Sequence, residues 1–225
     1  MMRSRYSLTT TLVAVALLLV AGQAAAFSFG KNNIKGSGDM ETRTLDLKDF
    51  HAIDVGGAFD LDITLGDKQK VVMTIDDNLW DNLEAEVHGG TLEIGWDKSC
   101  NPDGDCRVEI VVRKLDAMDI HGAADVGIRD FHGDSFSFDV SGAAELDMDG
   151  TVDKLDISVS GAGDIDTRDL KAKVVKISVS GAGEAKVFAS ESFEGRVSGV
   201  GNIDYWGDPE HQKTKVSGMG DISRK

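Results

Sequence analysis

The chain has 225 residues, of which 39 are acidic and 24 are lysine or arginine, so its formal net charge is −15 at pH 7. An acidic surface disfavours nucleic acids and anionic membranes as partners, because both require lysine and arginine to neutralise their charge. With only 2 prolines and as many as 26 glycines, the composition favours long uninterrupted strands joined by tight turns.

The first 26 residues have the pattern of a secretory signal peptide. Arg3 and Arg5 precede the apolar run of residues 12–22, and the alanines that end at Ala26 supply a cleavage site. The run is about half of the roughly 20 residues that a membrane-spanning helix needs, so no membrane span is expected in the mature chain. We predict cleavage near Ala26 and a periplasmic or secreted protein. Cleavage removes two basic and no acidic residues and changes the formal charge from −15 to −17.

The segment that follows, residues 27–41, is polar and glycine-rich and predicts a flexible lead-in. Residues 42–225 are expected to form one domain whose first half is less regular than its second. In that first half, "IDDNLWDNL" (75–83) favours a short helical turn. "EVHGGTLEIGW" (86–96) predicts a hairpin through Gly89 and Gly90.

The two cysteines, Cys100 and Cys106, enclose the short loop "CNPDGDC". An exported chain meets oxidising conditions, and Pro102 and Gly104 favour a turn, so a disulfide between the two cysteines is predicted. Two thiols with no histidine nearby do not make a zinc site. The aspartates of the loop lack the ligand spacing of a calcium-binding loop.

A short motif built on glycine recurs along most of the chain. Its variants are "GGAFD", "HGAAD", "SGAAE", "SGAGD", "SGAGE", "SGVGN" and "SGMGD". The glycine at the second position of each, the corner glycine, is Gly57, Gly122, Gly142, Gly161, Gly181, Gly199 or Gly218. From Gly122 onward the glycines are 18 to 20 residues apart. The gap of 65 residues between Gly57 and Gly122 has room for three longer turns. A fixed period of this length is typical of a solenoid.

Around each of these glycines, apolar and polar residues alternate strictly. Leu155, Ile157 and Val159, for example, are separated by Asp156 and Ser158. Period-two alternation predicts strands with one buried side, and the corner glycines fall on the buried parity. We therefore predict an all-β fold, a β-solenoid of about 20-residue coils, in which the glycines face inward and let the backbone bend over the core.

The residues also resemble a known family. The repeated "SGAGD", "SGVGNI" and "SGMGDI", preceded by "FHAIDVGGAFDLDITLGD" and "LEAEVHGGTLEIGW", are similar to the head GIN domain of putative autotransporter adhesins, over residues 42–225. The resemblance implies a right-handed, three-faced β-solenoid that bacteria export.

No residue pattern predicts catalysis or a bound cofactor. The glycine motif lacks the third glycine of a dinucleotide-binding loop, and no GK[ST] sequence follows it. None of the five histidines has a second histidine or a cysteine at metal-ligand spacing, and no G-x-S-x-G sequence is present.

Carboxylates recur three residues after the corner glycines. The carboxylates are Asp60, Asp125, Glu145, Asp164, Glu184 and Asp221, and Asn202 takes this position in the remaining copy. If the coils stack in register, these side chains form an outward column, in which like charges repel. Solvation relieves the repulsion in the simplest interpretation. The alternative is calcium bound along Asp125, Glu145, Asp164, Glu184 and Asp221.

These patterns favour an exported, non-enzymatic binding or scaffold module of the cell envelope, adhesin-like, whose long faces suit an extended glycan or protein partner. The alternative is a carbohydrate-active solenoid, a lyase or a hydrolase. Such an enzyme needs a basic group or an acid pair in a groove. Acid pairs such as Asp164 and Asp166 recur in several repeats, which indicates surface patterning instead of one differentiated site.

Overall fold

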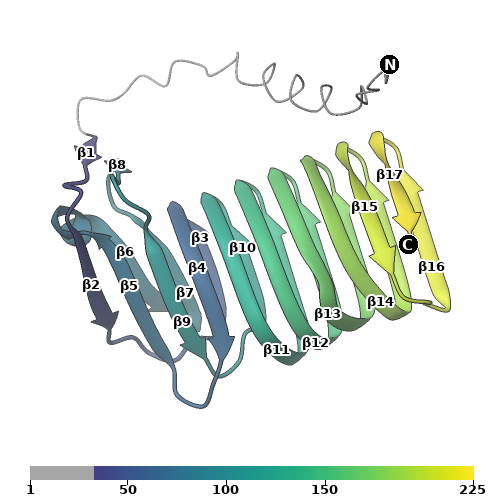
Figure 1. Cartoon of the computed structure of the whole chain (residues 1–225), viewed down its shortest axis with the longest axis horizontal. Coiled ribbons are helices and arrows are strands. Elements are labelled where there is room, and N and C mark those ends of the chain that lie inside the picture. The colour runs from purple at the N-terminus through teal and green to yellow at the C-terminus, as the bar shows by residue number, and fades with distance from the viewer. Residues whose placement is uncertain (1–32) are drawn as a thin grey trace, which may run out of the picture. The chain divides into compact units, whose positions relative to one another are not determined.

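A computed structural model describes residues 33–225. The predicted signal peptide, its cleavage point at Ala26 and residues 27–32 lie outside the described residues. The part from Ile34 to Lys225 is one compact unit, and nearly all of its regular structure is β-strand, stacked as coils (Figure 1).

The regular half of the unit consists of four long strands, each of which makes most of one coil. They are β11 (Ala123–Val140), β12 (Ala143–Val159), β13 (Ala162–Val179) and β14 (Ala182–Val197). Each strand pairs in parallel with the next in register, and the pairing is interrupted once or twice within each coil. Between β11 and β12 the register shifts between Ile128 and Phe131. The stacked parallel coils confirm the predicted β-solenoid.

Three shorter strands continue the stack toward the C-terminus. They are β15 (Val200–Trp206), β16 (His211–Val216) and β17 (Met219–Arg224). β15 pairs with the first part of β14 and with β17, whereas β16 pairs with the last part of β14. We call the stacked segments that follow each corner glycine the post-corner face, and the stacked segments that precede it the pre-corner face. A third set of short paired segments, such as 131–133 with 150–152, lies between the two in each long coil.

The N-terminal half departs from simple stacking. β3 (Ala52–Gly56) lies between β10 (Ala117–Ile120) and β7 (Thr91–Trp96), and β4 (Ala58–Leu65) lies between β11 and β9 (Arg107–Val112). The coil made by β7 and β9 thus sits on the far side of the coil that precedes it in sequence. The gap between Gly57 and Gly122 holds this one parallel coil, so the expected room for three stacked turns is not used in that way.

Antiparallel strands account for the rest of that gap. β5 (Lys70–Asp76) pairs with β9 and with β2 (Met40–Leu45), and β6 (Leu83–His88) pairs with β7. The predicted hairpin between β6 and β7 is confirmed, with Gly89 and Gly90 at φ values of 60° and 89° that suit glycine. The predicted helical turn is the 3₁₀ helix η2 (Asp77–Asn82).

The expected flexible lead-in is replaced in part by paired strands. β1 (Ile34–Lys35) pairs with β8 (Cys100–Asn101), and β2 begins at Met40. The buried carboxylate of Asp76 accepts hydrogen bonds from the backbone N–H of Gly38, at 2.7 Å, and of Asp103, at 3.1 Å. These bonds tie the N-terminal segment to the domain and to the loop between the cysteines.

The core consists of the alternating apolar residues that the sequence predicts. Leu155, Ile157 and Val159 are at most 2% exposed, whereas Lys154 and Asp156 between and beside them face solvent. Burying one aliphatic side chain of this size stabilises the fold by about 1.5–3 kcal/mol. Since every coil adds several such residues, the stack is stable where a single coil would not be.

From Gly122 onward, the corner glycines do not face inward as expected. A Cβ atom at Gly122, Gly142, Gly161, Gly181 or Gly199 would lie 1.9 Å from the carbonyl oxygen of the corner glycine one coil before. At Gly218 the same distance is 2.0 Å, and a Cβ at Gly57 would meet the Phe59 ring at 2.6 Å. From Gly122 onward the glycines are therefore required because neighbouring corners approach along the stack, whereas at Gly57 the buried Phe59 ring excludes a side chain.

The serine that precedes the glycine also serves the corner. The carbonyl oxygen of Val140 accepts three bonds from the next coil: the N–H groups of Ser160 and Gly161 donate at 2.8 and 3.2 Å, and the Ser160 hydroxyl donates at 3.1 Å. Ser180 repeats the arrangement on Val159. The Ser-Gly pair thus satisfies a carbonyl where the strand ladder is interrupted.

Candidate binding faces

The predicted carboxylate column exists in register on the post-corner face. Asp125 pairs with Asp60 on one side and Glu145 on the other. The column continues through pairs of Glu145 with Asp164, Asp164 with Glu184, Glu184 with Asn202, and Asn202 with Asp221. Burial, followed by the charges of Asp105 and Asp125, raises the pKa of Asp60.

Four members of this column are exposed and take part in no ion pair or side-chain hydrogen bond with the residues the structure describes: Asp125, Glu145, Asp164 and Glu184. We call these four the bare ladder. Parallel register places successive carboxylates along a line, about 4.8 Å apart, instead of converging them on one point. Within residues 33–225 there is no group of three or more histidine, cysteine or acidic residues that could hold a metal ion.

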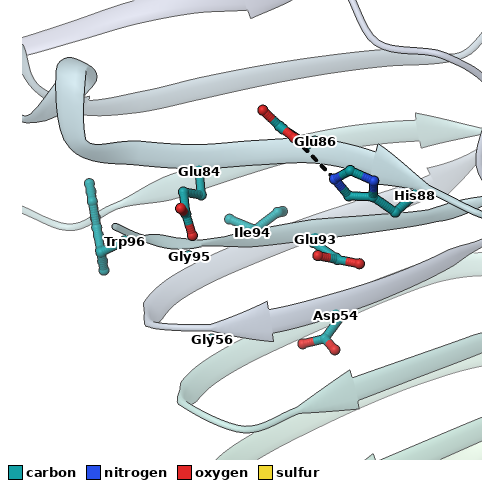
Figure 2. A pocket seen from close by; sticks show the side chains of 9 residues that line it. All are labelled: Asp54, Gly56, Glu84, Glu86, His88, Glu93, Ile94, Gly95 and Trp96. Carbon is teal, nitrogen blue, oxygen red and sulfur yellow. Dashed lines mark hydrogen bonds and ion pairs between the residues drawn. The ribbon is translucent and has the colours of Figure 1, made fainter. Parts of the chain in front are cut away.

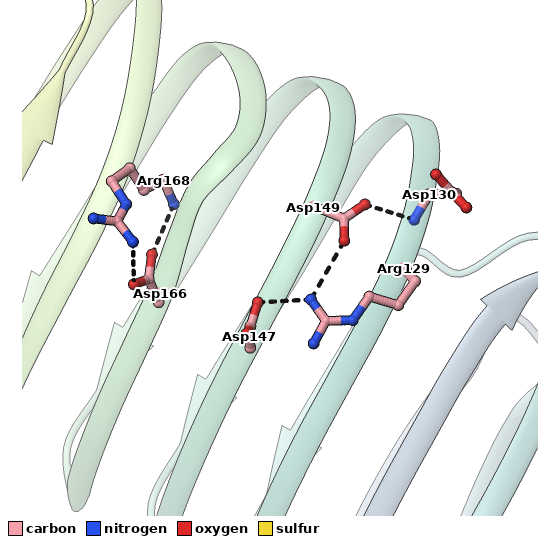
Figure 3. Close-up of polar contacts among 6 residues, drawn as sticks. All are labelled: Arg129, Asp130, Asp147, Asp149, Asp166 and Arg168. Carbon is pink, nitrogen blue, oxygen red and sulfur yellow. Dashed lines mark hydrogen bonds and ion pairs between the residues drawn. The ribbon is translucent and has the colours of Figure 1, made fainter.

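In the neighbouring column of the same face, Asp147 and Asp166 are partners on adjacent coils, and each has an arginine partner. Arg129 Nη1 donates to Asp147 at 2.8 Å and to Asp149 at 3.3 Å, and Asp149 also accepts the Asp130 N–H at 2.8 Å (Figure 3). On another coil, Arg168 donates to Asp166 through both its backbone N–H and its guanidinium. The acids of the bare ladder have no such partner among the described residues and remain available.

An aromatic pair lies on β14 and β15 of the post-corner face. Phe188 and Trp206 are partners on adjacent coils, and both are partly exposed. The Lys171 Nζ atom lies 4.3 Å from the Phe188 ring centroid, and the Arg168 Cζ atom lies 5.5 Å from that of Trp206. The sequence analysis missed this pair, although the alternation of Ala185 and Val187 with Lys186 and Phe188 predicts that Phe188 faces outward.

A cleft of about 240 Å³ lies over these two strands, β14 and β15, and over β17. Its polar lining comes from Glu184, Lys186, Asn202, Asp204, Asp221, Ser223 and Lys225. The end of the bare ladder, the cleft and the aromatic pair therefore occupy neighbouring strands of one face.

The pre-corner face carries a second cleft, of about 340 Å³, at its N-terminal end. Figure 2 shows its polar side chains, Asp54, Glu84, Glu86, Glu93 and His88, with Trp96 at one end. His88 Nε2 lies 3.0 Å from Glu86 Oε2. Glu93 pairs with Asp54, and Asp54 pairs with Asp119, so these three acids form a column along the pre-corner face. Partial burial, together with the charges of Asp139 and Asp54, raises the pKa of Asp119.

The predicted disulfide is not formed. Cys100 and Cys106 are free thiols. Cys106 is 4% exposed and packs in the core, and burial, together with the charges of Asp76 and Asp60, raises its pKa to about 12. Burial likewise raises the pKa of Cys100. Disulfide formation requires a thiolate, and these surroundings disfavour the thiolate at both positions.

No helix within residues 33–225 combines the length and the apolar character that crossing a bilayer would take.

Comparison with known proteins identifies relatives of this chain. The sequence model of the family described as "Putative auto-transporter adhesin, head GIN domain" matches residues 49–209. No curated protein matches the chain.

Among solved structures, a putative adhesin from Bacteroides fragilis NCTC 9343 is 24% identical, with a TM-score of 0.71, and the match covers 85% of this chain and 100% of that one. This likeness shows the fold. A putative adhesin from Parabacteroides distasonis ATCC 8503 is 19% identical, with a TM-score of 0.48, and covers 86% of this chain and 100% of its own. A putative lipid binding protein from the same organism is 23% identical, with a TM-score of 0.48, and covers 85% of this chain and 100% of its own.

Proposed function

We propose, from the premise that this chain belongs to the head GIN domain family of putative auto-transporter adhesins, that it is an exported, non-enzymatic binding module of the cell envelope. Its partner in this proposal is an extended glycan that lies along the post-corner face. A periplasmic or secreted location, after signal-peptide cleavage, is part of the same proposal.

The observation that carries the proposal is the combination of the bare ladder with the Phe188–Trp206 pair. A glycan offers hydroxyl donors at regular intervals and apolar ring faces. The bare carboxylates accept hydrogen bonds, and bonds to charged groups are stronger than neutral ones. Phe188 and Trp206 are partly exposed and supply apolar contact area on the same strands as the polar groups, and the cationic groups of Lys171 and Arg168 lie over their rings.

The test is a glycan array probed with the purified protein, followed by titration calorimetry on each polysaccharide that binds. Trp206→Ala should weaken binding about tenfold, which corresponds to roughly 1.4 kcal/mol, because it removes half of the aromatic platform. Glu184→Gln should weaken binding because it removes the charge from an acceptor of the bare ladder.

Two variants serve as matched controls. Trp206→Phe keeps an aromatic ring and should retain most of the binding. Glu191→Gln changes an exposed carboxylate outside the bare ladder and should bind as the parent does. Failure to bind any glycan, or binding that neither Trp206→Ala nor Glu184→Gln reduces, would refute the proposal. Release of reducing sugars from a bound polymer would instead favour the carbohydrate-active alternative.

A further inference from the structure

The outward column in the middle of the pre-corner face changes its charge along the stack. In spatial order its members are Glu86, Glu93, Asp54, Asp119, Asp139, Ser158, Ser178, Arg196 and Lys215, each paired in register with the next. The first five are acids, the next two are hydroxyls and the last two are cations. Solvation alone does not require acids at one end of a column and cations at the other.

We propose that a second copy of this chain docks on the pre-corner face, antiparallel to the first, so that the acidic half of each column faces the basic half of the other. Two copies related by a two-fold axis present the same patch to each other. If the axis runs along the strand direction, it reverses the stack direction and keeps the strand direction. Each column of one molecule then faces the same column of the other, with the order of the coils reversed.

The side chains select one register. When the axis passes between the coils of Asp139 and Ser158, Lys215 faces Glu93 and Arg196 faces Asp54. In the same register Ser178 faces Asp119, and Ser158 faces Asp139. No like charges meet in this arrangement, and two hydroxyl donors meet two carboxylate acceptors. A shift by one coil toward Glu86 would bring Asp139 against its own copy, which like charges disfavour.

The adjacent column of the face fits the same register. Its order is Thr91, Ala52, Ala117, Ser137, Asp156, Lys176, Glu194 and Lys213. Reversal around the same axis places Ser137 on Asp156 and Ala117 on Lys176, and again no like charges meet. A shift by one coil in the other direction, toward Lys215, would bring Asp156 against its own copy. Each column thus excludes one of the two neighbouring registers, and only the two together leave this one.

In this register, Lys215 and Arg196 of one copy lie against the acidic cleft of the other copy. Glu93 and Asp54, which face Lys215 and Arg196 in this register, both line the 340 Å³ cleft of Figure 2. Lys215 forms no ion pair with any residue that the structure describes, and Arg196 binds only Glu194 on its own coil. The hydroxyl groups of Ser158 and Ser178 likewise form no hydrogen bond within residues 33–225.

The expected affinity is modest. Eight coils span about 35 Å and five strand residues about 16 Å, so each copy would bury roughly 550 Å², which is near the lower end of specific interfaces. The post-corner faces stay free, so that a dimer presents two of them. Dimerisation is independent of glycan binding, and its test needs no glycan.

The test is a charge swap followed by sedimentation equilibrium of the purified protein over a range of concentrations. Lys215→Glu alone places Glu opposite Glu93, and Glu93→Lys alone places Lys opposite Lys215. Each should weaken the dimer at least about tenfold, as close charge pairs at interfaces do. Glu93→Lys and Lys215→Glu in one chain restore an opposite pair and should recover the dimer.

A matched control is Lys70→Glu, which makes the same charge change at an exposed residue of β5, outside both columns. It should leave the dimer unchanged. The exposed positions of all variants make misfolding a separate question, which circular dichroism answers. A protein that stays monomeric at every concentration, a dimer insensitive to Lys215→Glu, or a double variant no better than the single ones would each overturn the proposal.

Discussion

A Cβ atom at Gly181 would lie 1.9 Å from the carbonyl oxygen of Gly161. The two residues are corners of successive coils, and Gly161 stands in the same relation to Gly142. Since the clash is with backbone, no rotation of a side chain relieves it. The spacing between coils at the corner is thus compatible only with glycine, and the repeat of the Ser-Gly motif follows from the stacking of the coils.

Gly181→Ala should therefore destabilise the solenoid, by about 3 kcal/mol or more, since even overpacking that neighbours can accommodate costs roughly 1–3 kcal/mol. Urea unfolding followed by circular dichroism measures the change. Gly127→Ala is the control, because a Cβ there would lie 3.4 Å from Asp62 Oδ1, and it should cost far less. Equal midpoints for Gly181→Ala and the parent protein would contradict the corner geometry.

Much of the regular half follows from the sequence because one rule repeats in it. Alternation identifies buried residues such as Ile157, and the period places Asp125, Glu145 and Asp164 in one column, as the strand register shows. Because each repeat predicts the same pattern of buried and outward positions, an ambiguous assignment in one repeat is resolved by the others.

The N-terminal half could not be read in the same way. Nothing local indicates that β7 lies on the far side of β3 from β10, because both neighbours are apolar strands that pair in parallel. The direction of the corner glycines was also wrong in the sequence analysis. Parity assigns a residue to the inner or the outer side, whereas the absent Cβ of Gly181 points along the stack, a third direction that alternation does not encode.

Neither the aromatic pair nor the charge order of the pre-corner face could be predicted from the sequence, because both depend on which strands are neighbours. Phe188 and Trp206 belong to different repeats, and only the register of β14 on β15 shows that they are neighbours. The charge order from Glu86 to Lys215 likewise needs the spatial order of the coils, which differs from the chain order at β7.

The cysteines provide a test of the loop between β8 and β9. With a pKa of about 12 and a buried side chain, the Cys106 thiol should react with iodoacetamide at pH 8 about a thousandfold more slowly than an exposed thiol, because the thiolate is the nucleophile. Cys100, which is partly exposed, should react faster than Cys106. Peptide mass spectrometry at increasing times measures both rates.

Urea is the control for that experiment, since unfolding should make the two labelling rates equal. If neither cysteine reacts in urea until a reductant is added, the free-thiol state does not describe the purified protein.

The bare ladder should behave as solvated surface toward calcium. Its carboxylates lie in a line, and the described residues contain no group able to hold a metal ion. A cation that bound only the folded state would raise its melting temperature by mass action. We expect equal melting curves in calcium, magnesium and sodium chlorides at matched ionic strength. A rise specific to calcium that Asp164→Asn abolishes would contradict this expectation and revive the calcium alternative.

Asp119 should make the stability of the protein fall as pH rises through a defined window. Partial burial and the charges of Asp139 and Asp54 raise its folded-state pKa above the ordinary value of 3.8. Between 3.8 and that raised pKa the folded state binds more protons than the unfolded state, so the free energy of unfolding decreases as pH rises. Above the window, ionised Asp119 destabilises the fold by a constant amount.

Asp119→Asn keeps the shape of the side chain and removes its charge, so it should raise the melting temperature at pH 7. The difference from the parent should shrink as pH falls through the window and vanish below about 3.8, where Asp119 is protonated in both states. Thermal melts in dilute solution, where the protein is monomeric, measure the difference. Asp134→Asn removes one carboxylate at an exposed position outside this column; it is the control and should melt close to the parent at pH 7. A variant that melts below the parent at pH 7 would show that the Asp119 carboxylate stabilises the sheet, and would contradict the like-charge repulsion inferred for this column.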